Sequence, residues 1–292
     1  MKKIFLTALL STMLFASIRV DTTYSTFGAI VKKIGGDLVK VTVLGSPKYD
    51  PHFIVPKPSL ISKLRRADLL IMNGGGLELG WLPPLLRSAN NPKIQPGSNG
   101  FLDMSQFIDF IDKPSSVSRG FGDIHAQGNP HYSSDPHLVS IMARVIAKKL
   151  EIIDSSNEME YKSNLAKFLK EWKQYLSVLD SKMSSCKGEK VIEYHELYNY
   201  FFKQYGIISY GDIEPLPGIT PSSKHTIKLI KKMRENGVKL ILQDVYHEKK
   251  TAKFIASKTG AKVQIIPHDV GSVEGSDTLK SFYSTIANRI CP

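Results

Sequence analysis

The chain has 292 residues, of which 42% are hydrophobic and 23% are charged, a composition typical of a soluble globular protein. This length suits two domains of ordinary size. The formal net charge of +12 raises the question of nucleic-acid binding, but the basic residues are scattered over the expected outer faces of helices. They lack the interleaved aromatic side chains of a stacking surface, so we expect no nucleic-acid partner.

The first residues predict an exported protein. Lys2 and Lys3 precede a short apolar run at 4–16, which is shorter than the ~20 residues that span a bilayer. The pattern fits a secretory signal peptide, which we place at 1–19; a buried N-terminal helix is the alternative. Because no cysteine lies near the end of the run, we expect a soluble periplasmic protein without a lipid anchor.

The first half of the chain alternates predicted strands with predicted helices. We expect strands at 22–26, 39–44 and 68–72, helices at 28–34, 59–67 and 136–150, and loops rich in Gly, Pro, Ser and Asn at 90–100 and 114–128. Short alternation of this kind indicates βαβ units and a parallel sheet.

One long helix is expected in the middle of the chain. From Tyr161 to Met183 the apolar residues recur at steps of three, four and seven, and no Gly or Pro interrupts them. A helix of this length spans roughly 34 Å and could run along both lobes of a two-lobed protein. The alternative is an ordinary core helix of one domain.

The second half repeats the alternation. We expect strands at 190–194, 238–243 and 262–266 and helices at 197–205, 224–236, 252–259 and 277–290. The predicted fold class is therefore α/β, with two lobes, each a mostly parallel sheet flanked by helices, joined by one long linker helix. The predicted boundaries are 20–157 for the N-terminal lobe, 158–185 for the linker helix and 186–292 for the C-terminal lobe.

Three histidines and one aspartate stand where metal ligands could be presented. His52 lies in a proline-rich loop after the strand 39–44, and His131 follows a Gly-Asn-Pro turn. His195 and Asp269 follow predicted strands of the second half. Ligands bind beyond the carboxyl ends of parallel strands, so the four can meet between the lobes. Three imidazoles and one carboxylate suit zinc, although each residue could instead serve a turn or a strand end.

Two assignments stay open on residue type alone. His131 belongs to a cluster with His125 and His137, and the chemistry of the side chains does not decide which of the three binds metal. Glu193 lies two positions before His195 and on a strand faces the same way. It is a candidate to orient a ligand histidine, or simply a charged residue at the sheet edge.

The two cysteines, Cys186 and Cys291, predict a disulfide. An even number of cysteines in an exported chain favours a bridge, and helices that close a lobe often pack near its opening strand. Two separate buried thiols are the alternative.

The ordered series of motifs resembles the solute-binding proteins of bacterial zinc and manganese ABC transporters, of the cluster A-I type. The resemblance runs from about residue 22 to the end, and its residues are Ile34-Gly35-Gly36-Asp37, Asp50-Pro51-His52, Asn73-Gly74-Gly75-Gly76-Leu77-Glu78, Asn129-Pro130-His131, His195 with Tyr200-Phe201, and Asp269. It implies a metal ion held between two lobes by His52, His131, His195 and Asp269. It also implies a membrane permease as the partner, and we expect a monomer.

The resemblance favours zinc, with manganese as the alternative. Manganese-type members carry a carboxylate at the position of His195, and a shell richer in nitrogen suits zinc. Two features depart from the zinc pattern. The usual long His/Asp-rich loop is reduced to 122–131, and Asn129 replaces the more usual acidic residue, which together argue against high-affinity zinc scavenging.

Two other functions compete with metal delivery. An exported zinc hydrolase could use Glu193 or Glu196 as its base, but the chain has no His-Glu-x-x-His motif. An adhesin that binds metal only for stability would need no further motif. We expect a binding protein and not an enzyme.

Overall fold

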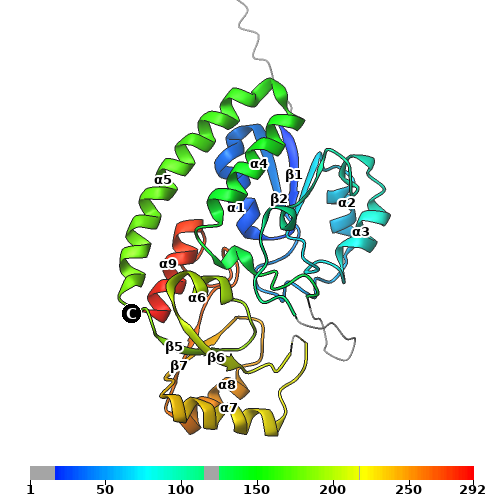
Figure 1. Cartoon of the computed structure of the whole chain (residues 1–292). Helices are drawn as coiled ribbons and strands as arrows, with labels where there is room; N and C mark the ends of the chain where they lie inside the picture. The colour runs from blue at the N-terminus through cyan, green and yellow to red at the C-terminus, as the bar shows by residue number, and fades with distance from the viewer. Residues whose placement is uncertain (1–16, 115–124, 217) are drawn as a thin grey trace, which may run out of the picture.

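The computed structural model describes residues 17–114, 125–216 and 218–292, and it has two α/β lobes with one long helix running along both (Figure 1). The predicted fold class is confirmed. The predicted signal peptide lies mostly in residues 1–16, outside the described part. Its predicted end at 19 falls inside the first strand, where Ile18 pairs with Val39, and the domain boundaries stay predictions.

The N-terminal lobe is built on a parallel four-stranded sheet in the order β2-β1-β3-β4. Its strands are β1 (Ile18–Thr22), β2 (Val39–Val43), β3 (Leu69–Met72) and β4 (Phe101–Asp103), and its helices are α1 (Ser25–Gly35), α2 (Pro58–Leu64), α3 (Leu82–Ala89) and α4 (Val139–Ile153). Short 3₁₀ turns lie at η1 (Gly36–Leu38), η2 (Pro92–Ile94), η3 (Met104–Phe107), η5 (Tyr132–Ser134) and η6 (Ser155–Asn157).

The C-terminal lobe repeats the same plan, with a parallel sheet in the order β6-β5-β7-β8. Its strands are β5 (Lys190–Glu193), β6 (Ile208–Asp212), β7 (Leu240–Gln243) and β8 (Lys262–Ile265), and its helices are α6 (Asn199–Tyr205), α7 (Ser223–Asn236), α8 (Lys250–Thr259) and α9 (Leu279–Ile290). Gly206, Gly237 and Gly260 end three of these helices in the left-handed region, which glycine adopts without a steric penalty.

The long helix α5 (Glu158–Ser184, 27 residues) packs against both lobes. Trp172 lies buried on its inner face and donates a hydrogen bond from Nε1 to Pro136 O at 2.9 Å. Tyr175 donates from its hydroxyl to Lys280 O, at the start of α9, at 2.8 Å. These contacts fix α5 to both lobes. None of the described helices is long and apolar enough to cross a membrane.

The predicted disulfide is confirmed. Cys186, just after α5, and Cys291, just after α9, are bonded with their Cα atoms 5.9 Å apart, within the usual range. In Figure 1 the end of the chain lies beside the end of α5. The bridge therefore ties the C-terminus to the junction between the long helix and the second lobe.

The predicted strand at 22–26 is wrong, because β1 ends at Thr22 and α1 already begins at Ser25. Two strands and one α-helix of the described residues were not predicted. The strand β6 lies at the sheet edge, and Ile208 and Ser209 at its start are exposed, so it lacks the apolar run of a buried strand. The strand β4 has only three residues, and the helix α3 carries prolines in its first turn.

Candidate metal centre

Three histidines meet between the two lobes. His52 stands in the loop after β2, His131 in the loop before α4, and His195 just after β5. One ring nitrogen from each lies within 4.8 Å of the others, and Nε2 of His195 is 3.3 Å from Nε2 of His131. His131 and His195 are buried, and the side chain of His52 is only 8% exposed. The structure thus gathers three imidazoles around one point.

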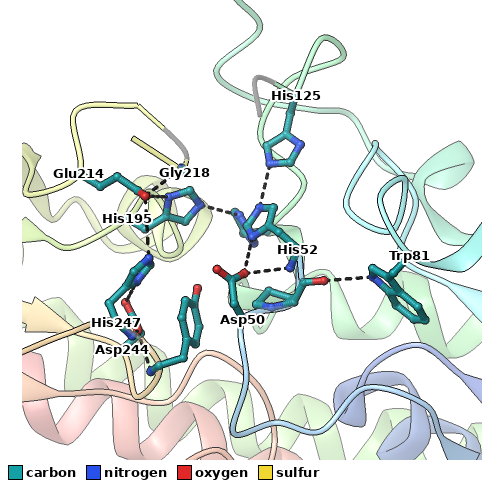
Figure 2. A network of polar contacts seen from close by, with 12 residues as sticks. Asp50, His52, Trp81, His125, His195, Glu214, Gly218, Asp244 and His247 are labelled. Atoms are coloured by element: carbon teal, nitrogen blue, oxygen red, sulfur yellow. Dashed lines mark hydrogen bonds and ion pairs between the residues drawn. The ribbon is translucent and has the colours of Figure 1, made fainter. Parts of the chain in front are cut away.

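A carboxylate holds the outer nitrogen of two of these rings (Figure 2). His52 Nδ1 lies 2.7 Å from Asp50 Oδ1, and His195 Nδ1 lies 2.7 Å from Glu214 Oε2. A carboxylate at Nδ1 keeps the proton there, so each Nε2 presents a lone pair to a metal ion. Burial raises the pKa of Asp50, but the hydrogen bonds and charge of His52 outweigh it and lower that pKa below its ordinary value.

Glu214 is itself held in place by a further group of residues. Its Oε1 accepts a hydrogen bond from Gly218 N at 2.8 Å and lies 3.9 Å from His247 Nε2. His247 in turn contacts Asp244 through Nδ1 at 2.7 Å. Burial lowers the pKa of His247, but the hydrogen bond and charge of Asp244 raise it above its usual value. Figure 2 shows Glu214 beside His195, with His247 and Asp244 below them.

His131 is positioned by the residue two places before it. The side chain of Asn129 accepts a hydrogen bond from His131 N at 2.8 Å, and its amide nitrogen donates to Glu196 O of the other lobe, also at 2.8 Å. Asn129 therefore shapes the turn and also bridges the lobes. Burial, followed by the charges of His195 and His52, holds the pKa of His131 well below its usual value. Its ring is therefore neutral, as a metal ligand must be.

The other two histidines of the cluster lie in different surroundings. His125 Nε2 is 3.2 Å from His52 Nε2, beside the three gathered rings. His137 points elsewhere, because its Nε2 contacts Asp180 of α5 at 2.9 Å. The structure thus separates the three histidines that sequence alone could not rank.

The structure does not bring Asp269 into the group of three. Ser25 N and Thr26 N donate to its Oδ2 and Oδ1, both at 2.8 Å, and Thr26 Oγ1 donates to Oδ1 at 2.6 Å. Asp269 therefore sits at the N-terminus of α1, across the gap between the lobes. A small cavity of about 30 Å³ is lined by both Asp269 and His131.

Glu193 does not contact His195 in the described hydrogen bonds. Its Oε2 accepts from Tyr198 N at 3.1 Å, and burial raises its pKa well above the ordinary value. Glu214 occupies the orienting position instead. Sequence reasoning missed Glu214 because it follows β6, a strand that was not predicted. It also missed Asp50, although the Asp-Pro-His spacing offered a local signal.

The amino-acid sequence matches the model of one protein family along nearly its whole length. The model of the family described as ZnuA, zinc-uptake complex component A, periplasmic, matches residues 20–290. The chain belongs to this family. Members of it are substrate-binding proteins and not enzymes, so the expected class is confirmed and the hydrolase and adhesin alternatives gain no support.

Individual relatives agree with the family assignment. The metal ABC transporter substrate-binding lipoprotein FimA of Streptococcus parasanguinis is 28% identical over 84% of this chain and 78% of its own length. The manganese ABC transporter substrate-binding lipoprotein PsaA of Streptococcus anginosus is 27% identical over 91% and 85%. The crystal structure of a ZnuA deletion mutant with zinc bound is 28% identical, with a TM-score of 0.79 over 95% of this chain and 99% of that one.

These names correct one expectation. FimA and PsaA are named lipoproteins, which overturns the prediction that the protein lacks a lipid anchor. The inference had rested on the absence of a cysteine near the predicted signal peptide. A position outside the cytoplasm agrees with the family description.

Proposed function

We propose that this chain captures a divalent metal ion between its lobes through His52, His131 and His195 and passes the ion to an ABC permease. The observation that carries the proposal is the convergence of three ring nitrogens within 4.8 Å of one another. Two of the rings have their outer nitrogen held by a carboxylate. The free lone pairs of these rings therefore face a common point in a buried site. Histidine ligands of a transition metal are oriented in this way.

Zinc is the preferred ion in this proposal. Neutral imidazole suits zinc, whereas manganese favours carboxylate, carbonyl and water ligands. The zinc-bound ZnuA mutant supports zinc by likeness, while the manganese name of PsaA keeps manganese as the competing ion. Because one chain supplies histidines from both lobes, the site needs no second copy, which supports a monomer.

The test is a calorimetric titration of the purified, metal-free chain with zinc and, separately, with manganese. One saturable site with tighter binding of zinc is the expected result. Tighter binding of manganese would refute the preference, and the lack of a saturable site for either ion would refute the proposed function.

A further inference from the structure

We propose that His125 is the fourth protein ligand of the metal ion, and that Asp269 instead fixes the N-terminus of α1. This inference rests on the proposed function, since it completes the coordination of the same site. A tetrahedral zinc site that is closed to solvent needs four protein ligands, and the gathered histidines supply three. His125 and Asp269 each line a cavity together with His131 and are the two candidates for the remaining position.

The spacing of nitrogen atoms favours His125. Zn–N bonds of 2.0–2.1 Å in a tetrahedral shell place neighbouring nitrogens about 3.3–3.4 Å apart. Nε2 of His125 lies 3.2 Å from Nε2 of His52, and Nε2 of His131 lies 3.3 Å from Nε2 of His195. Each pair thus already has the separation of one edge of such a tetrahedron. His125 lies outside the group of three whose nitrogens are all within 4.8 Å of one another, so its ring must turn toward His131 and His195 to complete the shell. Figure 2 shows His125 directed at His52.

The surroundings of His125 allow the ring to complete the shell. It stacks on His52 at a centroid distance of 5.2 Å and meets His131 edge-on at 5.9 Å. A cavity of about 230 Å³ is lined by His125, His131 and His195, so the ring has room to turn toward the other ligands. On its other side, a Cβ added at Gly76 would lie 3.7 Å from His125 Nδ1. A larger side chain at that position would restrict the ring.

Asp269 caps the N-terminus of α1. Its two oxygens accept hydrogen bonds from Ser25 N, Thr26 N, Thr26 Oγ1 and Val270 N. The first two amides belong to the first turn of α1, where a carboxylate is stabilised by the unpaired N–H groups and by the helix dipole. Oδ1 accepts three of these bonds and Oδ2 accepts one, so most of the acceptor capacity of the carboxylate is used at α1 and its position is fixed there.

Charge balance does not require Asp269 in the shell. Four neutral imidazoles leave the two positive charges of the ion uncompensated, but Asp50 and Glu214 each lie at the far nitrogen of a ligand ring, 2.7 Å from His52 Nδ1 and His195 Nδ1. Two carboxylates one ring away match the charge of a divalent ion. An all-nitrogen shell also sharpens the preference for zinc over manganese.

The test combines X-ray absorption at the zinc edge of the loaded full-length chain with zinc titrations of variants. The expected spectrum of the wild type contains four imidazole rings, and that of His125→Ala contains three. We expect His125→Ala to weaken zinc binding roughly tenfold or more. The matched control, His137→Ala, changes another histidine of the same cluster and should stay within about twofold of the wild type.

Three imidazole rings in the wild-type spectrum, or wild-type zinc affinity in His125→Ala, would overturn the assignment of His125. The wild-type spectrum settles the question even if a variant folds poorly. Failure of this inference differs from failure of the proposed function, in which the wild type itself takes up no zinc.

Discussion

The two lobes share a strand order but hold the histidines of the candidate metal site in different ways. In the N-terminal lobe, Asp50 orients His52 from two positions away in the same loop. In the C-terminal lobe, Glu214 orients His195 from beyond a different strand, nineteen positions along the chain. The first contact depends on a short turn and the second on the edge of a sheet. Orientation in the C-terminal lobe therefore depends on tertiary structure that the N-terminal lobe does not need.

The largest expected effect comes from the disulfide, which ties down only the C-terminal side of the molecule. Its sequence separation is 105 residues, and the chain-entropy model gives about 4–5 kcal/mol for a loop of this size. The double variant Cys186→Ser, Cys291→Ser should lose stability of this order in chemical denaturation, yet keep its zinc affinity, because the bridge lies away from the histidines. A double variant as stable as the wild type, or one with a large loss of zinc affinity, would contradict this separation of the disulfide from the metal site.

The next largest effect should come from Glu78, a buried residue of the N-terminal lobe, and should appear as a pH dependence of the unfolding free energy. Glu78 accepts hydrogen bonds from Asn73 N and Gly74 N, and burial raises its pKa to about 7. The folded chain therefore keeps a proton that the unfolded chain loses, so this group's contribution to stability falls as pH rises from about 4.5 to about 7. The shift is worth up to about 3 kcal/mol.

The measurement compares the unfolding free energy of the wild type and Glu78→Gln at pH 5 and pH 8 without metal. We expect the variant to gain on the wild type as the pH rises, because glutamine does not titrate. Parallel pH profiles for the two proteins would show that Glu78 titrates normally.

The pair Glu214→Gln and Asp50→Asn tests the difference between the lobes directly. Loss of such an orienting carboxylate typically costs 10–100-fold in metal affinity. The side chain of Glu214 is 8% exposed and that of Asp50 is 23% exposed, so solvent screens Asp50 more. We expect a loss near 100-fold for Glu214→Gln and nearer tenfold for Asp50→Asn in zinc titrations. A larger loss for Asp50→Asn would reverse the comparison.

The same contrast explains which parts of the fold and of the site could be predicted from the sequence. Strands such as β3 and the apolar stripe of α5 were predictable because hydrophobic periodicity reports local structure and burial. That His52, His131 and His195 lie together could be predicted because each stands in a distinctive short motif beside a turn or a strand end. The role of Glu214 could not, since it depends on the pairing of an exposed edge strand.

The position of Asp269 shows the other limit of sequence reasoning. Its loop after β8 fits a ligand, and nothing near it in the chain indicates that its partners are Ser25 and Thr26, more than 240 residues away. Similarly, residue type alone could not rank His125 against His137, because their difference lies in contacts with His52 and Asp180.

The central claim is that histidines from both lobes bind one metal ion, and zinc titration of His52→Ala and His195→Ala tests it most directly. Each variant removes a ligand from a different lobe while leaving the other histidines of the site in place. We expect each to lose at least about 100-fold in affinity, roughly 2.7 kcal/mol, with folding checked by circular dichroism. Wild-type affinity in either folded variant would show that the ion is not held between the lobes.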